Sequence, residues 1–550
     1  MRIGIRQRDG LLTRRDGLLA ALVVAGFVLR LQGLDWDQGR GLHPDEGNLV
    51  RAAIALGPGQ MIPEFHAYND LALWLPRLAA LPFCDSTSPD CLRGAARVLS
   101  AVFSGLAVWA MAAVAARLAG GTAGRTAALA TALLAATSAP LIQWAHFGTT
   151  ESALVLLVAL LWLQSLRWLR GEIGPVFAAA TSALLVGVGF GFKTTALVCA
   201  LIPLLALVQS RGEAARAGWR ALRWALPLGG LAALAAAPSV IFAPGNWLDS
   251  MRFERGVVAG SIPVFWTRQF AHGSGAMFQL HQLWSLLHGA GLVLAVVGVA
   301  FAPRTARPGL VAGLGYVLVH GAVVASWHAG FVRYLAPLLP VLVVAAGMGV
   351  ARLAASGLRV LRALAVAGAG LWVLAGLDLA ASYQAPDPRI LAETALATSA
   401  AAGAVVGIEP HDTPLPGNLS ALLLPLEDTD AAPLAEALAR SDWLLIASRR
   451  NWAVLPGHPD APLACGYYAA LASGALGFRI EGRFHRASPL WPLLAPGLSV
   501  EETRTVFDRP QVVIFRNDAR LDAGALEAVL TTAPGPCDAR TLGRAWGRAQ

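Results

Sequence analysis

The sequence predicts a polytopic α-helical membrane protein with a small α/β domain at its carboxyl end. Of its 550 residues, 56% are hydrophobic and only 14% are charged, whereas soluble globular proteins carry about 25% charged residues. Apolar runs of about 20 residues, the length that crosses the hydrocarbon core of a bilayer, recur as far as residue 381 and then stop. This composition excludes a soluble enzyme, a disordered chain and a small disulfide-rich scaffold.

Eleven of the apolar runs are predicted to be membrane-spanning helices. Glycine and proline within them do not argue against a span, because membrane helices tolerate both better than soluble helices do. The runs lie near residues 17–34, 95–118, 126–145, 151–169, 175–192, 195–209, 224–243, 284–302, 309–329, 335–351 and 363–381.

Arginine predicts the orientation of these spans. The loops predicted on one side are short and rich in arginine, as cytoplasmic loops are under the positive-inside rule. The amino terminus belongs to that side, since it contains Arg2, Arg6, Arg8, Arg14 and Arg15. A net charge of +9 suggests nucleic acid in a soluble protein. Here the arginine-rich loops account for the positive charge, and the sequence contains no nucleic-acid-binding motif.

Eleven spans divide the chain into two predicted units. Residues 1–381 form a transmembrane unit with a large outer loop at 35–94, and residues 382–550 form an extracytoplasmic soluble domain. Short apolar runs in the tail alternate with Pro, Gly and Asp clusters, and one helical pattern intervenes, which is typical of a small α/β domain. The runs are Ala404–Ile408, Trp443–Ala447 and Gln511–Phe515, and the helix lies near Ala432–Arg440.

Cysteine placement agrees with this topology. Cys84 and Cys91 share the first outer loop, and Cys465 and Cys537 share the tail. Both pairs would lie in an oxidising compartment, where two disulfides are expected. Free small thiols are the alternative.

Ionisable residues gather at the predicted outer ends of the spans. Glu151 and Lys193 are two of them. Because charge within a bilayer is costly, such placement indicates function. Transporters put their binding groups near the midplane, so this distribution favours chemistry at the outer leaflet. A multi-span transporter or a lipid flippase of the cell envelope is the alternative.

Two further stretches have a recognisable pattern. Residues 65–83 alternate polar and apolar side chains, which predicts an amphipathic helix lying on the outer leaflet as the roof of a groove. Glycines at 187, 189 and 191 precede Lys193, the only lysine of the chain. They do not form a nucleotide-binding loop, because Phe192 stands where that motif requires glycine. We expect them to permit close helix packing.

The sharpest acidic cluster is His43-Pro44-Asp45-Glu46, directly after the first predicted span. Two adjacent carboxylates cannot point the same way, so one can face a reaction centre while the other braces a helix. Pro44 followed by acidic residues is also typical of an ordinary helix start.

An acidic pair in this position resembles the signature of the GT-C membrane glycosyltransferases, in particular the branch containing protein O-mannosyltransferases and lipid A aminoarabinose transferases. Many relatives have Asp where this chain has Thr149-Thr150-Glu151. Four other stretches are similar to that family: 93–151, 189–194, 331–337 and 507–512.

The resemblance implies an inverting enzyme at the outer face of a bacterial inner membrane. It would move a sugar from a polyprenyl-phosphate donor to a protein, lipid or polysaccharide acceptor. Asp45 would be the general base, Glu46 its orienter or an acceptor contact, and Glu151 a second carboxylate. The residues that the resemblance assigns to the donor phosphate are Lys193, Arg333 and His146, with His43 and Tyr334 as further candidates. No cofactor is firmly expected, and a divalent cation held by the acids and histidines is the lesser option.

Overall fold

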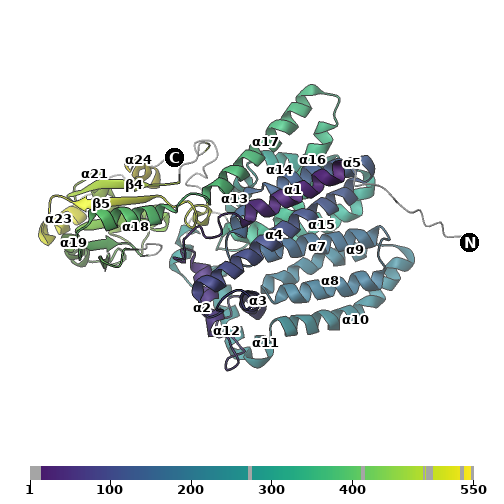
Figure 1. The fold of residues 1–550 in the computed structure, drawn as a ribbon, viewed down its shortest axis with the longest axis horizontal. Helices are drawn as coiled ribbons and strands as arrows, with labels where there is room; N and C mark the ends of the chain where they lie inside the picture. The colour runs from purple at the N-terminus through teal and green to yellow at the C-terminus, as the bar shows by residue number, and fades with distance from the viewer. Residues whose placement is uncertain are drawn as a thin grey trace, which may run out of the picture.

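The computed structural model describes residues 14–270, 275–410, 415–486, 490, 500–532 and 538–546. A bundle of long helices occupies one part of the molecule, and a domain built around a β-sheet lies beyond one end of it (Figure 1). Arg2, Arg6 and Arg8, expected on the cytoplasmic side, lie outside the described residues, as does Cys537.

Every predicted span contains a helix in the structure. Their order follows the chain, with several spans built from two consecutive helical pieces. The helices are α1 (Arg14–Leu31), α4 (Pro89–Ala119), α5 (Gly121–Ala136), α6 (Ala139–Ala145), α7 (Glu151–Leu169), α8 (Pro175–Phe190), η1 (Thr194–Ala200), α9 (Leu201–Gln209), α10 (Gly212–Ala236), α14 (Ala290–Ala300), α15 (Arg307–Ala325), η4 (Val332–Leu338), α16 (Leu339–Ala354) and α17 (Arg359–Ser382).

The membrane-spanning character of this bundle is confirmed, while the count of eleven stays a prediction. Among the described residues, five helices are long and apolar enough to cross a membrane. The number rises to seven if each of two bent pairs is one span: α5 with α6, bent by 53°, and α13 (Gly275–Leu286) with α14, bent by 94°. The remaining predicted spans are shorter or more polar.

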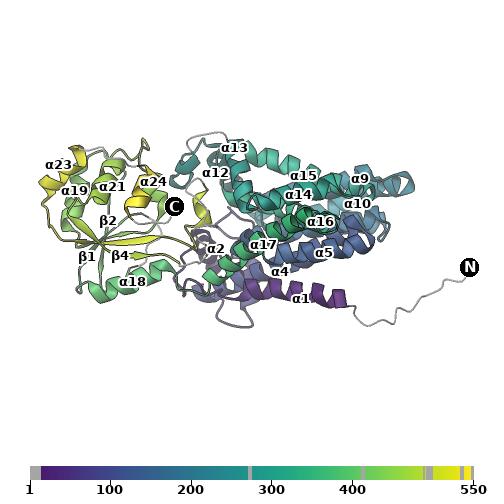
Figure 2. The same cartoon turned by 90° about the horizontal axis from the view of Figure 1, so that it is seen from above.

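Short helices cover the end of the bundle that faces the sheet domain (Figures 1 and 2). They are α2 (Pro44–Ala55), α3 (Asp70–Ala80), α11 (Ser239–Phe242), α12 (Pro244–Ala259) and η2 (Phe265–Phe270). The start of α1 lies at the opposite end of the bundle in both views. The predicted outer segments therefore share one end of the molecule. The expected amphipathic helix over residues 65–83 is shorter than expected, because only Asp70–Ala80 is helical.

The disulfide expectation is met in the first outer loop. Cys84 and Cys91 are bonded, with their Cα atoms 6.1 Å apart. Cys465 is also disulfide-bonded. Cys199 is a buried free thiol, as expected for a cysteine within the bundle.

The sheet domain has five strands in the order β2-β1-β3-β5-β4. β1 is parallel to β2 and β3, whereas β5 is antiparallel to β3 and β4. The strands are β1 (Val405–Ile408), β2 (Ser420–Leu423), β3 (Trp443–Ile446), β4 (Phe478–Phe484) and β5 (Val512–Asn517). Three of these strands coincide with the apolar runs of the tail, so the α/β prediction for this segment is confirmed.

Helices cover both faces of this sheet. α18 (Pro388–Ser399) lies on one side, and α19 (Ala431–Arg440), α21 (Ala464–Ser473) and α23 (Ala523–Thr532) lie on the other (Figure 2). Side chains of β3 alternate between the two layers: Leu445 packs with Leu396 of α18, while Leu444 packs with Leu434 of α19. The alternation follows from the two-residue period of a strand.

Close glycine packing joins α8 to α10. A Cβ on Gly187 would lie 2.5 Å from the carbonyl oxygen of Gly229, and one on Gly191 would lie 2.5 Å from the Cβ of Ala236. A side chain would force the backbones apart at both places. The packing role expected for these glycines is confirmed.

Candidate functional site

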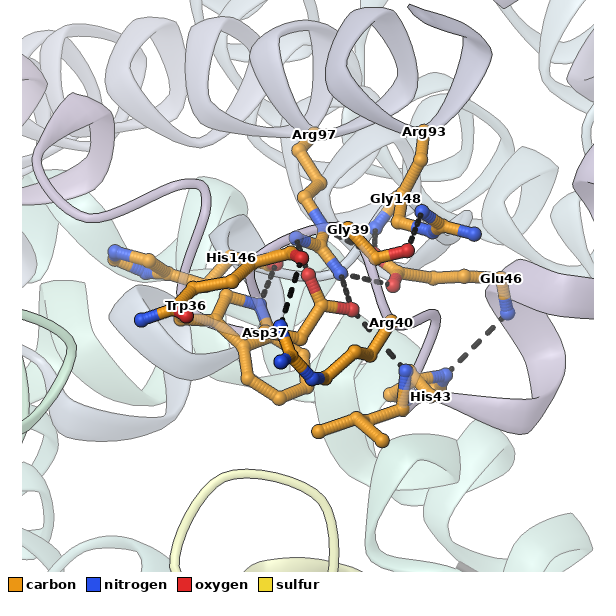
Figure 3. Close-up of polar contacts among 12 residues, drawn as sticks. Trp36, Asp37, Gly39, Arg40, His43, Glu46, Arg93, Arg97, His146 and Gly148 are labelled. Carbon is orange, nitrogen blue, oxygen red and sulfur yellow. Dashed lines mark hydrogen bonds and ion pairs between the residues drawn. The ribbon is translucent and has the colours of Figure 1, made fainter. Parts of the chain in front are cut away.

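A buried ion-pair network fixes the start of α2 (Figure 3). Arg97 of α4 donates to both carboxylate oxygens of Asp37, each at 2.9 Å, and to both oxygens of Glu46, at 2.9 and 2.6 Å. Both carboxylate side chains are 1% exposed or less. Such bidentate, charge-assisted hydrogen bonds are strong and directional. They hold the segment after α1 against α4.

Other contacts complete the setting of Glu46. The backbone N–H of Gly148 donates to Glu46 Oε1 at 2.5 Å. At the N-cap of α2, Nδ1 of His43 accepts from the Glu46 N–H at 3.4 Å. The His43 ring is packed between Phe147 and Phe507, with ring centroids 4.4 and 4.2 Å away. Both oxygens of the Glu46 carboxylate thus have donors, and the side chain acts as a brace.

Asp45 points elsewhere, although it is the next residue. Its carboxylate is ion-paired with Arg333, the second residue of η4. Both side chains remain partly exposed, at 22% and 24%. The Arg333 guanidinium also lies 5.0 Å from the ring centroid of Phe331 and 6.0 Å from that of Tyr334. An accessible carboxylate therefore faces an accessible cation.

A second acid–base pair also lies near Tyr334. Lys193 Nζ is 3.8 Å from Glu151 Oε1, with the carboxylate almost fully buried and the ammonium 19% exposed. The ammonium lies 5.4 Å from the ring centroid of Tyr68 and 5.8 Å from that of Tyr334. Because Lys193 and Arg333 both face the ring of Tyr334, the two ion pairs belong to one site.

The turn that carries Lys193 is held by α3. The backbone N–H of Asn69 donates to the carbonyl of Phe192 at 3.3 Å, and the N–H of Ala72 donates to that of Gly191 at 3.3 Å. The side chain of Asn69 donates to the carbonyl of Phe190 at 2.5 Å. The short helix α3 thus positions the lysine, which gives this part of the first outer loop a structural reason to be helical.

Glu254 of α12 is a third acidic group near this site. Burial raises the pKa of its carboxyl, and the charge of Lys193 partly offsets that rise. Nothing local in the sequence indicates that α12 folds back toward Lys193.

The structure brings together five of the residues that the sequence singled out: Asp45, Arg333, Glu151, Lys193 and Tyr334. It keeps His146 apart from them. The ring nitrogens of His146 lie 2.8 Å from the carbonyl oxygens of Ile142 and Gln32, and its ring stacks on Tyr383 with centroids 3.7 Å apart. His146 is fully buried in the described structure and makes structural contacts there.

Sequence reasoning missed Asp37 and Arg97. A signal was present, because Arg97 falls inside the apolar run predicted at 95–118 and a charge there needs a partner. The partner cannot be read from the sequence, since Asp37 is one of several acids in the first outer loop. Arg30, which lies in the first predicted span, has a structural role by contrast: it is buried and donates to Ser104 and to two carbonyls of α5.

An apolar cavity lies among α7, α8, α9 and α10. Its volume is about 280 Å³. Gly187 and Leu197, which stand on either side of Lys193 in the sequence, are among the lining residues. The lining extends to Trp168 and Leu207 at the far ends of α7 and α9. It offers space for a hydrocarbon chain along the bundle.

No metal centre is apparent in the part of the chain that the structure describes. Within it, no group of three or more His, Cys, Asp or Glu side chains is arranged to hold an ion. The cations that face the site are side chains.

No protein-family model and no curated protein matches the sequence. Solved structures with a similar shape include ArnT from Cupriavidus metallidurans bound to undecaprenyl phosphate, with a TM-score of 0.49 and 16% identity over 92% of this chain and 99% of that one. The oligosaccharyltransferase of Archaeoglobus fulgidus gives a TM-score of 0.43 and 13% identity over 88% and 76%. The arabinofuranosyltransferase AftD from Mycobacteria gives 0.38 and 16% over 93% and 42%.

These neighbours are glycosyltransferases of the GT-C fold, the group that the sequence motifs resemble. The similarity is one of overall shape at low identity. The roles of individual residues in this chain therefore depend on its own contacts.

Proposed function

We propose that the protein is a membrane glycosyltransferase that uses a polyprenyl-phosphate-linked sugar. The observation that carries the proposal is the pairing of Asp45 with Arg333 and of Glu151 with Lys193 around Tyr334. Transfer of a sugar from a lipid phosphate needs a carboxylate for the acceptor and cations for the phosphate. Both kinds of group are present, partly exposed and adjacent.

In the proposed reaction, Asp45 accepts the proton of an acceptor hydroxyl as its oxygen attacks the anomeric carbon. The bond between that carbon and the phosphate oxygen breaks, and the configuration inverts. Arg333 and Lys193 stabilise the departing polyprenyl phosphate by charge-assisted hydrogen bonds. Glu46 acts as a positioning residue, because Arg97 and Gly148 occupy its oxygens.

The ion pair between Asp45 and Arg333 also suggests an order of events. The phosphodiester of the donor carries one negative charge, as a carboxylate does, and competes with Asp45 for the guanidinium. Where the phosphate binds Arg333, Asp45 is left free to act as a base.

The apolar cavity gives the donor lipid a place. Its lining includes Gly187 and Leu197, on either side of Lys193 in the sequence, and extends along the bundle to Trp168. We assign this cavity to part of the polyprenyl chain. We further assign the transfer chemistry to residues 1–381, and an extracytoplasmic location to residues 382–550, in a bacterial inner membrane. The acceptor is a hydroxyl of a protein, lipid or polysaccharide.

The test is Asp45→Asn in the purified protein, assayed for sugar transfer from a polyprenyl-phosphate sugar. General-base assistance contributes about 10²–10⁴-fold, so the variant should lose activity by that factor while keeping its fold. Asp35→Asn is the matched control, since Asp35 is an exposed residue of the same loop. Unchanged transfer by Asp45→Asn would exclude Asp45 as the base. Passage of lipid across proteoliposomes without a glycosylated product would support a flippase instead.

A further inference from the structure

The sheet domain reaches into the candidate site through one short stretch, residues 500–509, called here the docking segment. It lies between β4 and β5 and includes the turn η5 (Glu502–Arg504). Its side chains are mostly buried. Glu502 pairs with Arg450 of the sheet domain at 2.5 Å, while Glu501, Phe507 and Asp508 contact the helical bundle.

Glu501 contacts the backbone next to Arg333. Its Oε2 accepts from the N–H of Val332 at 3.2 Å, and its Oε1 accepts from the Gln269 side chain at 3.0 Å. The backbone N–H of Glu501 donates to Gln282 Oε1 at 2.9 Å. The residue is 1% exposed. A buried carboxylate thus clamps the residue that precedes Arg333 and ties it to two other elements.

Phe507 contacts His43, two residues before Asp45. Its ring lies 4.2 Å from the ring of His43, the cap of the helix that begins beside Asp45. Its carbonyl accepts from Arg389 Nη2 at 2.5 Å, and Nη1 of the same arginine lies 3.4 Å from the carbonyl of Leu42. The docking segment therefore contacts the chain two residues before Asp45, at His43, and one residue before Arg333, at Val332.

The next residue secures the segment to the bundle. Asp508 Oδ2 accepts from the Gln143 amide at 3.0 Å and from the Tyr383 hydroxyl at 2.6 Å. A second contact between the two parts of the molecule lies away from this segment: Arg268 pairs with Glu427 at 2.7 Å, and the glutamate is half exposed. The buried contacts of the docking segment can therefore be compared with the more exposed Arg268–Glu427 pair, which lies outside it.

We propose that Glu501 is a positioning residue of the candidate site. By holding the backbone at Val332, it aims the Arg333 guanidinium at Asp45, where the donor phosphate would bind. The sheet domain is thereby part of the donor site, although none of its side chains needs to touch the donor. The effect on transfer depends on the proposed function, whereas the effect on the position of Arg333 does not.

The first test compares Glu501→Gln with Glu427→Gln in the full-length protein. An amide has one acceptor oxygen, so it cannot accept from Val332 on one side and from Gln269 and Thr503 on the other. Hydrogen exchange of peptides covering 331–338 should be faster by about tenfold in Glu501→Gln, as expected for one lost buried hydrogen bond. It should be unchanged in Glu427→Gln. Equal exchange in both variants would overturn the proposal.

The second test measures binding of undecaprenyl phosphate in detergent and the kinetics of transfer. A displaced Arg333 should weaken binding and raise the KM for the donor while leaving the KM for the acceptor unchanged. A merely structural defect would lower kcat by reducing the active fraction and leave both KM values alone, which would contradict the proposal. If the wild-type protein transfers no sugar but Glu501→Gln still alters exchange and lipid-phosphate binding, the positioning role holds and the proposed function fails.

A second variant covers the case in which Glu501→Gln does not fold. Phe507→Leu retains an apolar side chain but removes the ring contact with His43. It should speed exchange in peptides covering 42–50. If a folded Phe507→Leu protein exchanges at the wild-type rate in residues 42–50, the docking segment does not position that part of the chain.

Discussion

At the scale of single residues, two neighbouring carboxylates have opposite surroundings. Glu46 is buried and has hydrogen-bond donors on both oxygens, while Asp45 is partly exposed and faces a partly exposed arginine. The two adjacent acids were expected to point in different directions, and they do. Which acid faces the site follows from Arg97, whose buried guanidinium needs the carboxylates of both Asp37 and Glu46.

Removing Arg97 should therefore destabilise the protein strongly. Arg97→Met leaves two buried carboxylates without their counter-ion, and breaking a buried ion pair in this way costs about 3–5 kcal/mol. Arg117→Met is the matched control on the same helix, because the Arg117–Glu172 pair is partly exposed and such pairs contribute about 0–1 kcal/mol. Free energies of unfolding from reversible detergent denaturation measure both. Similar losses in the two variants would contradict the role given to the network.

His43 should make this region sensitive to acid. Burial, followed by the charges of Arg333 and Arg97, lowers the pKa of His43 well below its usual value of 6.5. The folded state therefore binds fewer protons at His43 than the unfolded state. The stability from neutral His43 is complete above pH 6.5 and is lost as the pH falls toward the lowered pKa, by about 1.4 kcal/mol for each unit of the shift.

Substitution by asparagine tests this expectation. His43→Asn keeps a side chain that can cap α2 but does not titrate. Between pH 7.5 and 5.5, the unfolding temperature of the wild type should drop further than that of His43→Asn. Parallel curves for the two proteins would assign the acid sensitivity to other groups.

At the scale of elements, helix positions were predictable and helix shapes were not. Apolar runs of sufficient length identify each span, because the bilayer sets that length. The 53° bend between α5 and α6 falls beside Pro140, but proline within a membrane helix permits a bend without requiring one. Strands β2 and β4 were not predicted: β2 is short and mostly exposed although Ala421, Leu422 and Leu423 are apolar, and β4 contains three charged residues and is mostly exposed or half-buried.

The glycines of α8 give a prediction at this scale. Gly187→Ala should destabilise the protein by about 1–3 kcal/mol, because the new Cβ meets the backbone of α10 at Gly229. Gly230→Ala is the control: its Cβ meets nothing within 4 Å, and alanine in a helix interior is favoured over glycine by about 0.5–1 kcal/mol. Unfolding temperatures in detergent should fall for the first and hold or rise for the second. An equal fall of the unfolding temperature in both variants would show that the contact between Gly187 and Gly229 is not its cause.

At the scale of the whole molecule, the short helices α2 and α12 and the sheet domain lie at one end of the bundle, away from the start of α1 (Figures 1 and 2). Arginine-rich loops predict that the start of α1 is cytoplasmic. A membrane-impermeant maleimide tests this orientation on intact spheroplasts. Thr429→Cys, in the sheet domain, should be labelled, and Ala355→Cys, between α16 and α17, should be labelled only after lysis. The reverse pattern would invert the topology.

The sequence alone predicted the residues that bear charge in the site better than the contacts that arrange them. Asp45, Lys193 and Arg333 stand out because they interrupt apolar or glycine-rich sequence near span ends. The contacts of Glu501 with Val332 and of Phe507 with His43 join positions 169 and 464 residues apart. No local pattern encodes them, since Glu501 and Glu502 read only as an ordinary acidic turn.

The position of the docking segment near the carboxyl end has a consequence for biogenesis. Helices leave the translocation machinery in the order of synthesis, so all of them can be inserted before residue 500 has been made. Until then Gln143 and Tyr383 lack the aspartate that joins them in the mature fold. Completion of the candidate site would thus be a late, post-insertion event, and a chain arrested shortly before that point would be embedded in the bilayer without the contacts of the docking segment.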